Sequence, residues 1–159
     1  MTGVKVKFPY IPTFLAFREL EPMLKAIKGL EADVYMIGAQ GVAHPRRAGL
    51  ASHLGVILDR PTLGVAKNRL CGEAEMPPDE RGAYTLLKDN GETIGAVVRT
   101  RTGVEPVYVS VGHKISLEVS IRITLETARN YRLPEPIRAA HGIATDAMRK
   151  EMGRTLRGN

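Results

Sequence analysis

The sequence has one cysteine, Cys71, no tryptophan and no long apolar run. A single cysteine excludes an internal disulfide, and this usage is typical of proteins from a reducing compartment. A membrane-spanning helix needs about 20 consecutive apolar residues, so the sequence predicts no membrane span. The first residues also show no apolar core of a secretory signal. We therefore expect a cytoplasmic protein.

Acidic residues are the minority among the charged residues. There are 17 Asp and Glu against 23 Lys and Arg, which gives a formal net charge of +6. A basic surface favours polyanions such as nucleic acid or an anionic membrane, although many soluble proteins are basic without such a partner. The length of 159 residues and the 43% hydrophobic content fit one domain, spanning residues 1–159, with a buried core.

The order of apolar patterns predicts an α/β domain with a mixed sheet flanked by helices. Asn90-Gly91 between two β-prone runs is the signal of a two-residue hairpin turn. We expect helices over residues 13–29, 46–58, 116–129 and 134–152, with Ser116 as the cap of the third helix. Strands are expected over 4–6, 33–37, 61–66, 84–87, 93–99 and 107–111.

Six short motifs occur in one order along the chain. They are residues 9–12 (PYIP) with 17–19 (FRE), 41–46 (GVAHPR), 49–55 (GLASHLG), 61–67 (PTLGVAK), 112–113 (GH), and 133–136 (LPEP) followed by His141. Together they cover residues 8 to about 150, and in this order they resemble the endonuclease V family. The resemblance implies a ribonuclease H-like fold and Mg²⁺- or Mn²⁺-dependent cleavage of a phosphodiester near deoxyinosine in DNA or inosine in RNA, as in DNA repair.

Three residues match the catalytic positions of that family. Glu19 matches its helix glutamate, a metal ligand, although a glutamate at a helix surface is the ordinary alternative. His141 matches its late histidine, and Ile137, Ala140, Ala144 and Met148 share its helical face, so we expect it to point inward. A core histidine with one hydrogen bond, or a partly exposed one, is the alternative. Lys67 matches the lysine beside the scissile phosphate.

Other motif residues match positions that bind nucleic acid in the family. The segment Pro9, Tyr10, Ile11 and Pro12 matches the wedge that separates the strands, because a rigid aromatic can stack on a base. Gly41 and Val42 match the pocket for a flipped base, where small residues let the backbone approach closely. Arg46, Lys67, Gly112 and His113 complete the set. Packing of Tyr10 on the core, a tight turn at Gly41 and solvated surface charge are the alternatives.

Two departures from the family concern its metal site. The strand that ends in an aspartate in the family ends here in Gly38, which has no side chain to bind a metal. The family's first strand, with its other aspartate, precedes the PYIP segment, and here only residues 1–7, none of them acidic, precede Phe8. The two departures leave Glu19 as the main carboxylate ligand, whereas Mg²⁺ and Mn²⁺ prefer several oxygen donors.

Two hypotheses follow from these departures. One is a nuclease with a weakened metal site, and the other is a catalytically degenerate homologue that binds nucleic acid or serves as a partner subunit. Without the first strands, residues 33–37 would form an unpaired edge of the sheet, and such edges favour pairing with another chain. We therefore expect a homodimer or a partner chain at this edge.

Overall fold

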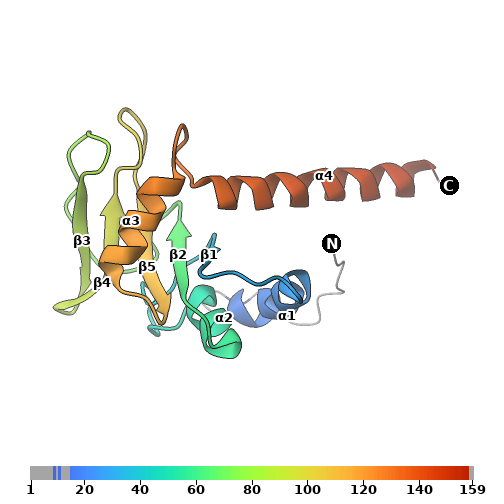
Figure 1. Ribbon diagram of the computed structural model, residues 1–159, viewed down its shortest axis with the longest axis horizontal. Coiled ribbons are helices and arrows are strands. Elements are labelled where there is room, and N and C mark those ends of the chain that lie inside the picture. Colours follow the sequence, from blue (N-terminus) through green and yellow to red (C-terminus); the bar gives the residue numbers. More distant parts are fainter. Residues whose placement is uncertain (1–8, 10, 12–14, 158–159) are drawn as a thin grey trace.

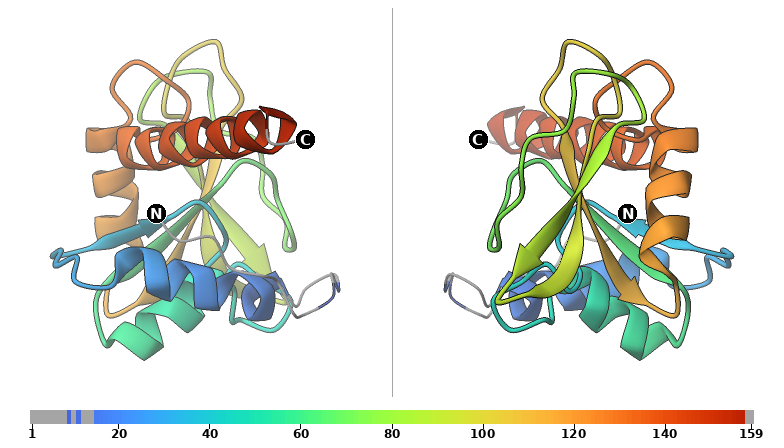
Figure 2. Two further views of the ribbon diagram at one scale, coloured as in Figure 1. Left: turned by 90° about the vertical axis from the view of Figure 1, so that its right-hand side faces the viewer. Right: turned by 90° about the vertical axis from the view of Figure 1, so that its left-hand side faces the viewer.

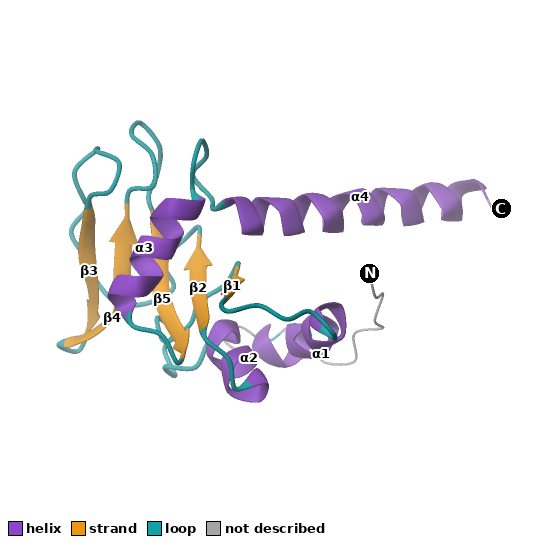
Figure 3. Cartoon of the chain, in the orientation of Figure 1, coloured by secondary structure: helices purple, strands orange, loops and turns teal. Residues whose placement is uncertain are grey.

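The computed structural model describes residues 9, 11 and 15–157, and it shows a mixed sheet with helices on both faces (Figures 1 and 3). The order of strands in the sheet is β1-β2-β5-β4-β3. The strands are β1 (Tyr35–Ile37), β2 (Thr62–Ala66), β3 (Tyr84–Asp89), β4 (Glu92–Val98) and β5 (Val107–His113). The helices are α1 (Leu15–Ile27), α2 (Leu50–Leu58), α3 (Leu117–Thr127) and α4 (Glu135–Arg157).

The strands pair as a mixed sheet should. β1 runs parallel to β2, and the other three neighbouring pairs are antiparallel. The hairpin between β3 and β4 is confirmed: Asn90 and Gly91 have φ angles of 52° and 82°, and positive values at both positions are what a type I′ turn requires. β1 is shorter than the predicted strand, and the strand predicted over residues 4–6 lies outside the described residues.

The main core lies between the sheet and α3, which stands against one face (Figure 2). Ser116 caps this helix as predicted, because its hydroxyl accepts a hydrogen bond from the amide of Val119. Ile121 packs onto a cluster of fully buried strand residues, Leu63, Val65, Ala96, Val98, Val107 and Val109. Burying one such side chain contributes about 1.5–3 kcal/mol, so this face dominates the stability of the fold.

Helix α2 covers the opposite face of the sheet, because Thr62 alternates with the α3-facing Leu63 and its hydroxyl donates to the carbonyl of Ala51, 2.9 Å away. α1 packs on α2 through a second cluster that includes Ala16, Leu54 and Ile37. α2 begins at Leu50 rather than near residue 46 as predicted. The reason is local: Arg47 has a left-handed φ of 52° and its amide donates to the carbonyl of His44, so the chain makes a turn there instead of a helix.

Helix α4 extends away from the sheet on the side of β1 (Figure 1). Only its first turn reaches the core, through Ile137, whereas Ile143 and Met148 are 66% and 60% exposed. The prediction that His141, Ala140, Ala144 and Met148 face inward is therefore wrong, since all four are exposed. No described element lies under this part of α4. None of the helices within residues 15–157 has the length and hydrophobicity needed to cross a bilayer.

Candidate nucleic-acid interface

The glycine-rich segment that follows β1 is the least regular part of the α2-facing side of the sheet. We call residues 38–49 the crossing segment, because they pass over β2 and β5 towards the β3–β4 hairpin. Two glycines make this route possible. A Cβ on Gly64 would come within 2.4 Å of the carbonyl oxygen of Ala39, and a Cβ on Gly41 would come within 2.0 Å of that of Val111. No side chain fits at these distances, so the backbone itself covers the sheet.

Hydrogen bonds hold the middle of the crossing segment on β5. The amide of Gly41 donates to Oγ of Ser110 at 2.9 Å, and the amide of Val42 donates to the carbonyl of Val111 at 2.8 Å. A Cβ on Gly41 would also lie 3.1 Å from the amide nitrogen of Gly112. The structure therefore brings together Gly41, Val42 and Gly112, which the sequence analysis selected from separate motifs.

The crossing segment also contacts the loop after β2, which carries Lys67. Nε2 of Gln40 donates to the carbonyl of Asn68 at 3.0 Å. Gln40 is buried, and its Oε1 has no hydrogen-bond partner among the described residues. Arg132 holds the same loop by donating to the carbonyl of Lys67, while Lys67 itself is exposed. A cation thus lies next to the glycine-rich surface and is open to a polyanion.

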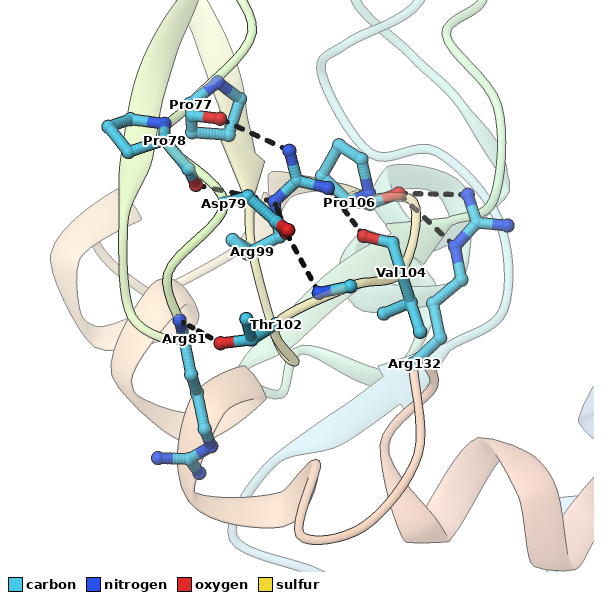
Figure 4. Close-up of polar contacts among 10 residues, drawn as sticks. Pro77, Pro78, Asp79, Arg81, Arg99, Thr102, Val104, Pro106 and Arg132 are labelled. Carbon is cyan, nitrogen blue, oxygen red and sulfur yellow. Dashed lines mark hydrogen bonds and ion pairs between the residues drawn. The ribbon is translucent and has the colours of Figure 1, made fainter.

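Buried and half-buried arginines hold the loops at this end of the sheet (Figure 4). The guanidinium of Arg99, a buried residue, donates to the carbonyls of Pro77, Pro78 and Val104. Arg132 donates in the same way to the carbonyl of Pro106 at 2.8 Å. Both arginines therefore satisfy backbone groups of irregular loops, and they support the site rather than face a ligand.

Glu19 lies on the helix face that packs near the end of β1. Ala16 and Met23, three residues before it and four after it, belong to the cluster that contains Ile37 and Ala39. Burial raises the pKa of the Glu19 carboxyl, and the charge of Arg18 partly opposes this effect. The Glu19 side chain is therefore half-buried beside the end of β1, and its catalytic role stays a prediction.

Gly38 and the first turn of α4 are neighbours. A Cβ on Gly38 would lie 3.5 Å from Cγ2 of Ile137, an ordinary contact distance, and apart from its chain neighbours no other described residue would come within 4 Å. His141 follows Ile137 by one helical turn and is exposed. There is therefore space for a side chain at Gly38, which lies between the end of β1 and α4, the helix that carries His141.

The described residues do not fit a resident divalent metal ion. No group of three or more His, Cys, Asp or Glu side chains gathers anywhere in the part of the chain that the structure describes. Glu19 is the carboxylate near the end of β1, and Gly38 contributes no donor. Mg²⁺ and Mn²⁺ prefer several oxygen ligands, so this set of donors is too small.

His113 lies away from Lys67. The β2–β5 pairing aligns His113 with Thr62, whereas Lys67 follows the other end of β2, roughly 15 Å away at about 3.3 Å per residue. Nε2 of His113 is 3.4 Å from Oδ1 of Asp59, and Nζ of Lys114 is 2.6 Å from the same oxygen. His113 is thus part of an ion-pair cluster at the end of α2.

The two arginines at the turn before α2 differ in what the structure shows of them. Arg46 is exposed, as a phosphate-binding residue should be. Arg47 instead pairs with Asp89 and Glu92, so it is not a phosphate ligand. His44 is buried and Nδ1 of its ring accepts from the amide of Arg46, which makes it a structural histidine.

Burial raises the pKa of the Cys71 thiol, as expected for a small apolar residue rather than a reactive one.

The predicted wedge lies at the limit of the described residues. Pro9 and Ile11 are exposed, Ile11 to 40%. Tyr10 and Pro12 lie outside the described residues. Sequence reasoning did not select Gln40, Ser110 or Arg132, which hold the crossing segment and the Lys67 loop. Only contacts between distant parts of the chain reveal them.

Comparison with known proteins gives one consistent result. Residues 1–142 match the family model described as Endonuclease V. The chain is 56% identical over 137 residues to the endonuclease V of Methanothrix thermoacetophila, covering 86% of this chain and 61% of the relative. It is 50% identical over 143 residues to that of a Roseiflexus species, covering 89% of this chain and 64% of the relative. The chain therefore spans a little under two thirds of the length of these relatives.

Solved structures agree with this similarity. The crystal structure of endonuclease V from Streptomyces avermitilis superposes with a TM-score of 0.87 at 41% identity, covering 93% of this chain and 66% of that one. A Ciona intestinalis endonuclease V, crystallised with a 23mer DNA containing an inosine followed by a ribo-adenosine, superposes with a TM-score of 0.78 at 33% identity. That match covers 94% of this chain and 70% of the Ciona chain.

Proposed function

This chain belongs to the endonuclease V family, and from that membership we propose that it recognises nucleic acid containing deoxyinosine or inosine. Its five-stranded mixed sheet with helices on both faces is the ribonuclease H-like α/β fold of the family. The observation that carries the proposal is the seating of Gly41 directly on Val111 beside Gly112. DNA repair is the process that such recognition would serve.

The crossing segment supports recognition of a base taken out of its stack. Enzymes that read a flipped base need a pocket in which backbone groups approach the base edge closely. Gly112 is half-buried, and Val42 offers a small apolar side chain near it, whereas Gly41 is buried with its amide and carbonyl bonded to Ser110 and Gly49, so it supports the pocket rather than presenting free backbone groups to the base. Hypoxanthine differs from adenine at its hydrogen-bonding edge, so backbone amides and carbonyls are suitable groups to distinguish the two bases.

Exposed cations and the wedge complete the proposed interface. Lys67 lies beside the crossing segment, and Arg46 is exposed on it. Cations at such positions bind phosphates and orient the strand, whereas base contacts determine specificity. The exposed Pro9 and Ile11 of the wedge suit contact with unstacked bases, with Tyr10 as the stacking residue. His113 is also part of the proposed interface, but it lies at the end of β5 that is away from Lys67.

Cleavage is the second part of the family's activity. Proteins of the family use divalent metal cations, and Mg²⁺ or Mn²⁺ is the choice we propose. In this chain Glu19 on α1 and His141 on α4 would be the residues that take part in metal-dependent cleavage, with Lys67 near the scissile phosphate. Because the described donors do not form a metal site, we propose that these residues bind inosine-containing strands and do not cleave them efficiently. A catalytically degenerate binding protein is therefore the form of the function that the geometry favours.

The open edge of the sheet supports the proposal of a partner. Within the described residues β1 hydrogen-bonds to β2 on one side only, and it is an edge strand of the sheet. Helix α4, on which Ile143 and Met148 are exposed, extends on the side of β1 (Figure 1). An unpaired strand beside exposed apolar residues favours association, with a second copy or another chain as partner.

The cytoplasm is the compartment we propose, on the basis of the single cysteine.

One pair of assays tests the proposed function. Fluorescence anisotropy would compare otherwise identical single strands of DNA or RNA that carry hypoxanthine, adenine or guanine at one position. We expect tighter binding of the hypoxanthine strand and little product when Mg²⁺ or Mn²⁺ is added. Equal affinity for all three strands would refute the recognition. Efficient cleavage that Glu19→Ala abolishes would show that the chain is an active nuclease.

A matched pair of lysine variants tests the orientation of the strand. Lys67→Ala should weaken binding to all sequences and reduce the slope of log affinity against log salt by about one. Lys28→Ala, at an exposed position just after α1, should leave both quantities unchanged. An equal effect of the two substitutions would show that binding depends on net charge alone.

A further inference from the structure

Arg47 links the far end of the crossing segment to the β3–β4 hairpin. Its Nε lies 2.7 Å from Oε2 of Glu92, and its Nη1 lies 2.9 Å from Oδ2 of Asp89. Nη2 also donates to the carbonyl of Asp89 at 3.4 Å, and Nη1 donates to the carbonyl of His44 at 3.2 Å. Asp89 and Glu92 flank the hairpin turn at Asn90-Gly91. One guanidinium therefore joins two segments that are 45 residues apart in the sequence.

The backbone at Arg47 is unusual as well. Its φ is 52°, in the left-handed region that residues other than glycine, asparagine and aspartate rarely adopt. A conformation of this kind persists where the surrounding contacts hold it in place. Here the contacts are the side-chain bonds to the hairpin and the hydrogen bond from the amide of Arg47 to the carbonyl of His44. The strain and the ion pairs thus lie at the same residue.

The other anchors of the crossing segment lie earlier in the chain. Gly41 and Val42 are bonded to β5, and Ala43 packs against Leu87 and Ile94. After Ala43, His44 and Arg47 donate within the segment to the carbonyls of Val42 and His44, and Gly49 donates back to Gly41. From this stretch the Arg47 side chain reaches the sheet at Asp89 and Glu92.

We propose that Arg47 is a positioning residue, which holds the crossing segment against the β3–β4 hairpin and thereby sets the shape of the surface formed by Gly41, Val42 and Gly112. The proposal rests on the proposed function for its consequence in binding, but not for its geometry. Charge-assisted hydrogen bonds from a planar guanidinium to two carboxylates fix direction as well as distance. A lysine could match the charge but not this geometry.

The test removes the partners of Arg47 and leaves the crossing segment itself unchanged. The double variant Asp89→Asn/Glu92→Gln keeps the hairpin and its turn residues but loses both carboxylates. In hydrogen exchange of the unliganded protein, we expect the amides of His44, Arg47 and Gly49 to exchange about tenfold faster, with amides of α3 unchanged. The double variant Glu80→Gln/Glu105→Gln, at two exposed positions, makes the same change in net charge and should leave all of these amides unchanged.

Binding gives a second readout. Loss of the carboxylates should reduce the preference for the hypoxanthine strand over the adenine strand about fivefold or more, with a smaller effect on affinity for the adenine strand. If Arg47 had a purely structural role, loss of the carboxylates would lower the unfolding temperature and would weaken the binding of both strands equally. Arg47→Glu combined with Glu92→Arg reverses the pair, and it should recover part of the protection and of the preference that Arg47→Glu alone removes.

The outcomes separate the two proposals. Unchanged exchange in the Asp89→Asn/Glu92→Gln variant overturns the role of Arg47, whatever the binding data show. Faster exchange with an unaltered base preference also overturns the role of Arg47, because the surface formed by Gly41, Val42 and Gly112 would then not depend on its pairs with Asp89 and Glu92. A wild-type protein without base preference refutes the proposed function, while the exchange experiment still decides whether Arg47 holds the segment.

Discussion

A Cβ added at Gly38 would lie 3.5 Å from Cγ2 of Ile137, a normal van der Waals distance, with no other atom within 4 Å among the described residues beyond its chain neighbours. The position is exposed, and Gly38 is not among the residues with a positive φ angle. A side chain can therefore be added there without strain, although the sequence has none.

The first prediction uses this open position. Gly38→Asp should fold with a melting temperature close to that of the wild type and should bind Mn²⁺ about tenfold more tightly, because it adds a carboxylate oxygen near Glu19. Isothermal titration with Mn²⁺ measures the affinity, and Gly38→Asn provides the uncharged control. Gly41→Asp should be strongly destabilised, since its Cβ would lie 2.0 Å from the carbonyl of Val111. A misfolded Gly38→Asp protein would contradict the geometry of the site.

The second prediction concerns the pH dependence at Glu19. Burial raises the pKa of this carboxyl in the folded protein, so the charged form opposes folding above that pKa. Glu19→Gln should therefore have a higher melting temperature than the wild type at pH 7. As the pH falls through the folded pKa and then the unfolded one, the wild-type carboxyl becomes protonated in both states and the difference should disappear. Thermal unfolding at pH 7 and pH 3.5 measures it, and a lower stability of the variant at pH 7 would contradict it.

The third prediction concerns the loop network around Arg99 (Figure 4). Arg99→Met should lower the free energy of unfolding by about 3 kcal/mol, because it leaves the carbonyls of Pro77, Pro78 and Val104 without a donor. Urea denaturation measures this loss. Arg101→Met removes an exposed arginine that donates to one carbonyl, that of Asn130, and should lower stability by less than about 1 kcal/mol. Equal losses would show that the Arg99 contacts are not special.

The fourth prediction concerns acid unfolding at Asp59. The hydrogen bond and charge of Lys114, together with those of His113, lower the pKa of the Asp59 carboxyl in the folded protein. The ionised carboxylate therefore stabilises the fold above the unfolded pKa, and this contribution is lost as the pH falls through the folded pKa. Asp59→Asn should be less stable than the wild type at pH 6 and equally stable at pH 2.

The Asp59→Asn comparison is well matched, because asparagine tolerates the left-handed φ of 52° at this position. Asp33→Asn, at an exposed carboxylate before β1, serves as the control and should show no such pH-dependent difference. A constant difference between wild type and Asp59→Asn across the pH range would rule out the ion pairs as its cause.

Local signals in the sequence predicted most of the elements of the fold. The Asn90-Gly91 turn and the Ser116 cap depend on neighbours in the chain, and both are confirmed. Strands also occur near the ranges predicted between residues 33 and 111. The predicted start of α2 was wrong, because Arg47 adopts a left-handed turn, closed by the bond from its amide to His44, and its side-chain partners Asp89 and Glu92 lie far away in the sequence. Helical spacing around His141 also gave a wrong prediction, that this residue points inward, since spacing shows which residues share a helix face but not whether another element covers that face.

The candidate site divides in a similar way. Family motifs selected Gly41, Val42 and Gly112, and the structure places them together. The same reasoning grouped His113 with Lys67, whereas the register of β5 puts His113, next to Gly112, at the other end of β2 from Lys67. Gln40, Ser110 and Arg132 escaped selection because their role is to hydrogen-bond residues far away in sequence. A buried glutamine and a buried serine carry no motif of their own.

The anchors of the crossing segment have a consequence for the order of folding. Gln40 bonds to a residue 28 positions later, Arg47 to one 45 positions later and Gly41 to one 69 positions later. Contacts this distant form slowly, because long loops must close before any stabilisation is gained. During synthesis the surface formed by Gly41, Val42 and Gly112 therefore cannot assemble until the ribosome has released β5, although residues 38–49 emerge well before that strand.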